Sequence, residues 1–161
     1  MIREFFTKKK QAITIPSADA KNDVPEGIMT KCPDCKQIIL TKDLIKTAKV
    51  CPKCDHHFKM TAWERVECLF DENTFKSMDD HLKSENPLNF PSYTEKIASD
   101  SEKTGLNEAV LTGIGKIGGN EVGVAIMDSH FRMGSMGSVV GEKITRAVEK
   151  ATELRIPLLI F

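Results

Sequence analysis

Apolar residues alternate with other residues along the chain from residue 110 to residue 126, on both sides of the turn Gly118-Gly119-Asn120. The alternating positions are Val110, Thr112 and Ile114 before the turn, and Val122, Val124 and Ile126 after it. A period of two places successive side chains on opposite faces of a strand, and a glycine-containing turn between two such runs is typical of a hairpin. This part of the sequence therefore predicts a β-hairpin.

The period then changes to that of a helix. After a glycine-rich loop over 132–138, apolar residues recur at Val140, Ile144, Ala147, Val148, Ala151 and Leu154. Pro157 ends this helix, and Leu158-Leu159-Ile160-Phe161 predicts a buried strand. Strand, loop, helix and strand make a βαβ unit with a right-handed crossover, so the fold class is α/β. A parallel core strand needs cover on both faces, and the sequence stops on this one. We therefore expect the front part of a longer protein, or a partner chain that supplies the missing layer.

A short amphipathic helix is predicted before this unit. Thr61-Ala62-Trp63-Glu64 has the form of a capping box, with a hydroxyl at the helix start and a glutamate three residues later. Trp63, Val66 and Phe70 follow on one stripe, which we expect to face the core. The expected organisation is a flexible tail over 1–27, a cysteine-containing module over 28–60, a helical and polar connection over 61–108, and an incomplete α/β core over 109–161.

Four of the five cysteines form two Cys-Pro-x-Cys motifs separated by fifteen residues, Cys32, Cys35, Cys51 and Cys54. The spacing C-x2-C-x15-C-x2-C is typical of a zinc site, because two intervening residues let one tight turn aim both sulfurs at a single ion. We expect residues 37–40 and 48–50 to form two strands that connect the motifs as a zinc ribbon. The alternative of two disulfides is disfavoured, since the sequence has no secretory signal. Four thiolates leave no open coordination position, so the zinc is expected to be structural.

Charged residues are unevenly distributed along the chain, although their totals balance. Lys plus Arg and Asp plus Glu are equal at 23 each, which removes a global argument for a nucleic-acid or membrane partner. Residues 28–60 contain seven lysines against three aspartates, whereas residues 61–105 contain ten acidic against five basic residues. Reduced cysteines and the absence of a long apolar run favour a cytoplasmic protein. Cys68 has no partner motif, and an unreactive thiol on a helix is the favoured interpretation.

The glycine loop is the second place where the sequence offers chemistry. Gly134-x-x-Gly137-x-x-x-Gly141 matches neither the dinucleotide nor the P-loop fingerprint. Free backbone N–H groups at a helix start could hold an anion or a developing oxyanion. From spacing alone, the favoured interpretation is that the glycines only permit a tight turn and close helix packing. His130 follows Asp128 and Ser129, but adjacency in sequence does not make a catalytic triad, so an ordinary loop histidine is favoured. His56 and His57 are expected to be surface residues or neighbours of the ligating cysteines rather than ligands, and His81 is expected to be solvated.

Together these motifs resemble the β subunit of the bacterial acetyl-CoA carboxylase carboxyltransferase, in the form seen in Gram-positive bacteria. The resemblance covers about residues 27–161. It is carried by the two Cys-Pro-x-Cys motifs, by the run D-S-H-F-R-M-G-S-M-G-S-V-V-G-E-K-I over 128–144, and by the closing P-L-L-I-F over 157–161. It implies a crotonase-like α/β core behind the ribbon, and zinc ligation by the four paired cysteines. It also implies that Gly134, Ser135, Met136 and Gly137 form a wall of the acyl-CoA site, with no catalytic residue assigned in this chain.

The resemblance implies an enzyme of fatty-acid biosynthesis. Such an enzyme moves a carboxyl group from carboxybiotin, held on the biotin carboxyl carrier protein, to acetyl-CoA, and the product is malonyl-CoA. The implied partners are a carboxyltransferase α subunit in an α2β2 assembly, the carrier protein, and biotin carboxylase in the wider complex. The family continues beyond the last strand with a second glycine pair that holds the thioester oxygen. That pair is absent here, so we expect residues 1–161 alone to be inactive.

Two other interpretations of the ribbon stay open. Lysines are spread over the module, Lys31, Lys36, Lys42, Lys46, Lys49, Lys53 and Lys59, and could bind nucleic acid, although Phe58 is the main aromatic residue available for stacking. Alternatively, the ribbon could be a lid or a docking surface for a partner subunit.

Overall fold

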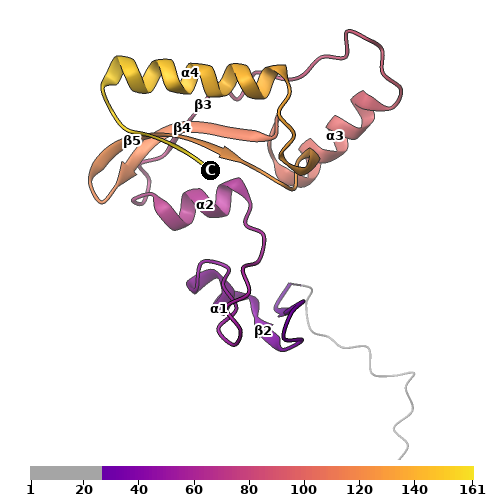
Figure 1. Ribbon diagram of the computed structural model, residues 1–161, viewed down its shortest axis with the longest axis vertical. Helices are drawn as coiled ribbons and strands as arrows, with labels where there is room; N and C mark the ends of the chain where they lie inside the picture. The colour runs from indigo at the N-terminus through magenta and orange to yellow at the C-terminus, as the bar shows by residue number, and fades with distance from the viewer. Residues whose placement is uncertain (1–26) are drawn as a thin grey trace, which may run out of the picture.

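The computed structural model describes residues 27–161, and the tail predicted over 1–27 lies almost entirely outside the described residues. The ribbon module forms one end of the molecule, and an α/β unit forms the other (Figure 1). In the α/β unit a four-stranded sheet lies between α4 on one face and α2 on the other. The elements of this unit are α2 (Ala62–Leu69), β3 (Lys76–Met78), α3 (Tyr93–Thr104), β4 (Val110–Ile117), β5 (Asn120–Met127), α4 (Ser138–Leu154) and β6 (Leu158–Ile160).

The predicted hairpin is present. β4 and β5 pair antiparallel from Val110 opposite Met127 to Ile117 opposite Asn120. Gly118 and Gly119 both have positive φ, at 57° and 81°, which a two-residue turn of the primed type requires. Asp71 closes this turn from outside, because its two carboxylate oxygens accept the N–H groups of the two glycines at 3.0 and 2.8 Å.

The helices α2 and α4 also form where the sequence predicts them. The capping box of α2 is complete: Thr61 Oγ1 accepts the Glu64 N–H at 3.2 Å, and Glu64 Oε2 accepts the Thr61 N–H at 3.0 Å. Val66 and Phe70 face the core as expected. Trp63 does not, since it is 40% exposed, and Ala62 takes the buried position at the helix start.

The closing strand β6 pairs parallel with β5, which completes the βαβ unit. It is less covered than predicted. Leu158 and Leu159 are half-buried, whereas Ile160 is 56% exposed and Phe161 is 42% exposed. The core lies instead under the hairpin and its two covering helices, in a cluster formed by Ala62, Val66, Phe70, Leu106, Ala109, Val110, Leu111, Val122, Val124, Ala125, Ile126, Phe131 and Val140.

The region 61–108 contains an element that the sequence analysis did not predict. Lys76–Met78 forms β3, which pairs antiparallel with residues 112–114 of β4 and is the first strand of the sheet. Lys76 and Ser77 are exposed, so this edge strand lacks the apolar alternation that would reveal it.

The ribbon differs from the expected pair of strands between the cysteine motifs. β1 (Met29–Lys31) pairs with β2 (Ile38–Leu40) around the first motif, and the helix α1 (Thr41–Lys46) fills the space between the motifs. Residues 48–50 form no strand, and only one bridge joins Val50 to His57. The second motif is therefore reached through a helical turn, with Leu44 buried against the cysteines.

Candidate metal centre and glycine loop

The two cysteine motifs have the same local structure. In the first, Cys32 O accepts the Lys36 N–H at 3.1 Å and the Cys32 N–H is donated to Gln37 O at 2.9 Å. In the second, the equivalent bonds run from Asp55 N–H to Cys51 O at 3.0 Å and from Cys51 N–H to His56 O at 2.8 Å. Lys36 and Asp55, each directly after the second cysteine of its motif, both adopt positive φ. Each motif is thus a closed turn that presents two sulfurs on one side.

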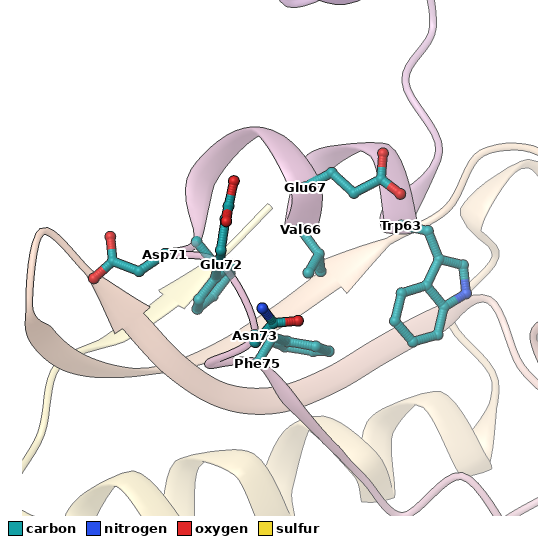
Figure 2. Close-up of a pocket in the computed structure, with 8 residues that line it drawn as sticks. Trp63, Val66, Glu67, Asp71, Glu72, Asn73 and Phe75 are labelled. Carbon is teal, nitrogen blue, oxygen red and sulfur yellow. The ribbon is translucent and has the colours of Figure 1, made fainter.

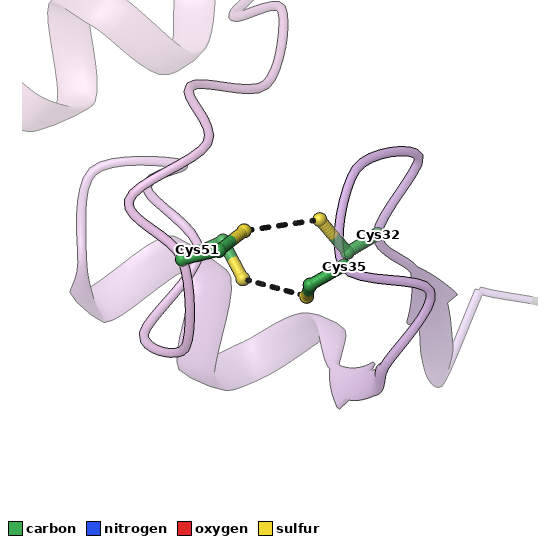
Figure 3. A group of neighbouring side chains, drawn as sticks. Cys32, Cys35 and Cys51 are labelled. Carbon is green, nitrogen blue, oxygen red and sulfur yellow. Dashed lines mark hydrogen bonds between the residues drawn. The ribbon is translucent and has the colours of Figure 1, made fainter.

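The four sulfurs meet at one point between the turns (Figure 3). Cys32 Sγ lies 3.7 Å from Cys54 Sγ, Cys35 Sγ lies 3.8 Å from Cys51 Sγ, and all four lie within 4.8 Å of one another. A zinc ion with Zn–S distances of ~2.3 Å in a tetrahedron requires sulfur–sulfur separations of ~3.8 Å. The cysteines are free rather than disulfide-bonded. Their arrangement is therefore that of a site positioned to bind one zinc ion.

Ionisation of the thiols supports the same chemistry. Burial acts to raise the pKa of Cys51, but the backbone N–H groups of Lys53 and Cys54 outweigh it and bring this pKa to about 7. At Cys54 the N–H of His56 acts to lower the pKa, but burial and the neighbouring thiols raise it to about 12. Ionisation of one thiol therefore disfavours ionisation of its neighbours. A bound divalent cation supplies the positive charge that lets all four thiols ionise.

The remaining histidines and Cys68 lie outside this group of sulfurs. His56 packs its ring edge-on against Phe58, with the centroids 5.1 Å apart, and His57 is exposed. Cys68 is exposed on α2. An ion pair connects the ribbon to the α/β unit, because Lys49 Nζ lies 2.7 Å from Glu64 Oε1.

The glycine loop connects β5 to α4 through a turn with unusual backbone angles. Arg132, Met133 and Gly134 form a short 3-10 turn, and all three have positive φ. The turn is held by Gly134 N–H donating to Phe131 O at 2.8 Å and by Ser135 Oγ donating to Arg132 O at 2.6 Å. A non-glycine residue held at positive φ loses about 1 kcal/mol or more of conformational free energy, and Arg132 and Met133 both do so. Such backbone strain clusters at functional sites.

A cavity of about 190 Å³ lies beside this loop. Three of the four predicted acyl-CoA wall residues line it, Ser135, Met136 and Gly137, whereas Gly134 does not. The other residues that line it are Ser84, Tyr93, Ile97, Glu108, Ala109, Phe131 and Arg132. Gly137 is the N-cap of α4, and no side chain of residues 27–161 caps this helix, so the N–H groups of its first turn are left for a ligand or water. Met133 is 87% exposed and Met136 is 72% exposed, so neither packs into the core.

Asp128 is a structural residue at this site that sequence reasoning missed. It is fully buried, and its Oδ1 accepts the N–H of His130 and contacts His130 Nδ1, both at 2.8 Å. Its Oδ2 accepts the N–H of Ala62 at 2.8 Å. The carboxylate thus connects the start of α2 to the start of the glycine loop. The sequence signal was a charged residue directly after a buried strand.

Two further buried charged residues were also missed. Lys143 lies on the inner face of α4 and is buried, as is Glu108 just before β4. Burial lowers the pKa of Lys143, while Asp80, Asp79 and Glu108 act to raise it. Glu108 also accepts the N–H of Ser84 at 2.7 Å. The position of Lys143 between Val140 and Ala147 on the apolar stripe was the signal that could have revealed it.

The fold and the four sulfurs define a class of protein, a C4 zinc ribbon followed by part of an α/β domain of the crotonase fold. Residues 56–161 match the carboxyl transferase domain family, and residues 30–54 match the acetyl-CoA carboxylase zinc finger domain. The chain therefore belongs to the carboxyl transferase family.

Solved structures agree with this family. The 12S transcarboxylase core, determined with methylmalonyl-CoA and methylmalonic acid bound, is 27% identical, with a TM-score of 0.52 over 64% of this chain and 18% of that chain. A single-chain, multi-domain long-chain acyl-CoA carboxylase shares the fold at 20% identity, with a TM-score of 0.53 over 64% of this chain and 11% of that chain. The chain thus spans less than a fifth of either. Within residues 27–161, no helix is long and apolar enough to cross a membrane.

Proposed function

We propose that this chain is part of the β subunit of an acetyl-CoA carboxylase carboxyltransferase, of the type seen in Gram-positive bacteria. The observation that supports this proposal is the pairing of two family matches in one chain, an acetyl-CoA carboxylase zinc finger directly before a carboxyl transferase domain. The proposed reaction transfers a carboxyl group from carboxybiotin to acetyl-CoA and gives malonyl-CoA, a precursor for fatty-acid biosynthesis.

In this proposal the cavity beside the glycine loop receives the acyl end of acetyl-CoA. The acetyl methyl group loses a proton, its carbon bonds to the carboxyl carbon, and the carbon–nitrogen bond of carboxybiotin breaks. The proton ends on that biotin nitrogen, so the chain needs no base of its own. The residues Ser135, Met136 and Gly137 position the thioester, and the N–H groups of the first turn of α4 favour the developing enolate charge.

The four paired cysteines are proposed to hold one structural zinc ion, which supplies folding energy to the ribbon and no open coordination position for substrate. The proposed partners are a carboxyltransferase α subunit in an α2β2 assembly, the biotin carboxyl carrier protein, and biotin carboxylase in the wider complex.

The test is a carboxyl-transfer assay between malonyl-CoA and biotin with the full-length protein and its α subunit. Gly137→Val should raise the KM for the CoA substrate about tenfold or more, because the new side chain enters the cavity. Gly141→Val is the matched control, since it also meets open space but does not line the cavity. A well-folded complex without transfer activity would refute the proposed function, and equal KM values for both variants would refute the placement of the site.

A nucleic-acid-binding role for the ribbon is the second candidate. It is favoured by the exposure of most of its lysines, including Lys31, Lys36, Lys42 and Lys46. Binding of RNA or DNA that weakens steeply as salt rises would support it, and salt-independent or absent binding would exclude it.

A further inference from the structure

A groove of about 570 Å³ lies away from both the metal centre and the glycine loop, between α2 and the segment that leads to β3. One part of its lining is apolar, with Trp63, Val66, Phe70 and Phe75, and the other part is polar, with Glu67, Asp71, Glu72 and Asn73. In Figure 2 Trp63 stands at one end of the groove and Asp71 at the other, with Val66 and Phe75 between them.

The aromatic part of the groove is held rigidly. Phe70 and Phe75 are 5.1 Å apart between ring centroids, and Trp63 meets Phe75 edge-to-face at 6.1 Å. The rings of both phenylalanines pack against β4 at positions where this strand has a glycine. A Cβ on Gly113 would lie 2.5 Å from the Phe75 ring, and one on Gly115 would lie 2.5 Å from the Phe70 ring. The strand therefore leaves room for these two rings, and the rings form a firm inner wall.

The outer part of the groove carries negative charge without a matching cation. Glu67 and Glu72 are exposed, and neither forms an ion pair within residues 27–161. Asp71 is occupied, because both of its oxygens accept hydrogen bonds from the hairpin turn. Among the described residues, no lysine, arginine or histidine lines the groove. Carboxylates at the rim and aromatic faces behind them attract organic cations and repel phosphate.

We propose that this groove is a docking site for a segment of a partner protein that carries lysine or arginine next to an apolar residue. The cationic side chain lies between Glu67 and Glu72, where it gains charge attraction and a contact with the exposed ring of Trp63. The neighbouring apolar side chain covers Phe75. Charge complementarity selects this occupant over nucleic acid, and the inference is independent of the carboxyl-transfer proposal.

Trp63 makes the proposal directly measurable, because it is the single tryptophan of residues 1–161 and it lines the groove. The zinc-loaded chain is titrated with the peptide acetyl-Phe-Lys-Leu-Arg-amide while tryptophan emission is followed. The expected result is a saturable change that weakens about tenfold between low and high salt. The same peptide with glutamate in place of lysine and arginine should produce no saturable change.

Matched variants separate the groove from general surface charge. The double variant Glu67→Gln with Glu72→Gln keeps Trp63 as reporter and should bind the basic peptide about fivefold more weakly. The control double variant, Glu102→Gln with Glu149→Gln, removes two exposed carboxylates outside the groove and should bind like the unaltered chain. Equal binding by both double variants, or equal binding of the acidic peptide, would overturn the proposal. A further result would also overturn it. If Trp63 in a longer form of this chain shows the blue-shifted emission of a buried tryptophan, and the peptide does not change that emission, then the chain's own residues cover the groove.

Discussion

Asp128 shows how one buried side chain can connect segments that are far apart in sequence. Its three contacts reach Ala62 at the start of α2 and both the backbone and the ring of His130. The sequence places Asp128, Ser129 and His130 side by side, which invites a catalytic interpretation. The structure instead gives the carboxylate a positioning role, because a buried carboxylate that accepts several N–H groups fixes the segments that donate them.

Replacing Asp128 by asparagine should destabilise the α/β unit by about 2 kcal/mol. The asparagine amide has only one acceptor oxygen. Its NH₂ group must then face one of the backbone N–H donors, so that hydrogen bond is lost and two buried donors oppose each other. The measurement is the free energy of unfolding from urea titration. Glu149→Asn is the control, because this exposed residue lies on α4 and forms no ion pair with another described residue, and it should change the free energy of unfolding by less than about 0.5 kcal/mol. Equal stability of the two variants would contradict the role given to Asp128.

Glu64 predicts a pH dependence at the junction of the ribbon and α2. Burial acts to raise its pKa, but the ammonium of Lys49 and the N–H of Thr61 outweigh burial and lower it below the ordinary 4.5. A lowered pKa means that the stabilisation is complete above the pKa of the unfolded chain and is lost as the pH falls through the folded-state pKa. Glu64 is partly exposed, so the effect should stay below about 1 kcal/mol.

The measurement for Glu64 is the free energy of unfolding between pH 6 and pH 3. The variant Glu64→Gln should show a weaker decrease over this interval than the unaltered chain, whereas Glu102→Gln should follow the unaltered chain. Parallel pH curves for Glu64→Gln and the unaltered chain would show that this carboxylate does not contribute.

Among the elements, periodicity was informative only where an element has eight or more residues and packs against the core. The hairpin, α2 and α4 satisfy that condition, and the sequence predicted all three. The short elements β3 and α1 do not satisfy it, because three to six residues carry too little pattern, and tertiary contacts decide their conformation. The candidate sites divide in the same way. The cysteine spacing reveals the sulfur cluster. The groove beside Trp63 is not visible in the sequence, because its aromatic wall depends on the space that the glycines of β4 leave for the rings of Phe70 and Phe75.

Gly115 in β4 and Gly141 in α4 lead to opposite predictions for the same substitution, glycine to alanine. Gly115→Ala should cost about 2 kcal/mol, since the new Cβ would lie 2.5 Å from the Phe70 ring and 3.1 Å from the Phe75 backbone. Gly141→Ala should stabilise the protein by about 0.5–1 kcal/mol, because the position lies inside α4 and the new Cβ has no described atom within 4 Å apart from the neighbouring helix backbone. Thermal or urea unfolding of both variants tests the pair, and a neutral Gly115→Ala would show that the aromatic wall can shift.

At the scale of the whole molecule, the ribbon and the α/β unit have separate cores. The ribbon core contains Leu44, Ile39, Phe58 and the cysteines, whereas the larger core lies between the sheet and its two helices. The connection between them includes residues 59–61 and the ion pair of Lys49 with Glu64. A small core of this kind cannot offset the loss of chain entropy without the metal, so the two parts should respond differently when zinc is removed.

Removing zinc with a chelator should unfold residues 29–58 and leave the α/β unit folded. Zinc binding contributes roughly 10 to 16 kcal/mol to small modules of this kind, which exceeds what their cores supply. Of the helices, α1 has only six residues, whereas α2, α3 and α4 have 8, 12 and 17, so most of the helical circular dichroism signal should remain. Amide hydrogen exchange should accelerate in the ribbon and stay slow in β4 and β5. Cys35→Ser should reproduce this state at full zinc supply, and Cys68→Ser should retain one zinc ion per chain. Loss of most of the helical signal on chelation would mean that the ribbon also stabilises the sheet and its helices.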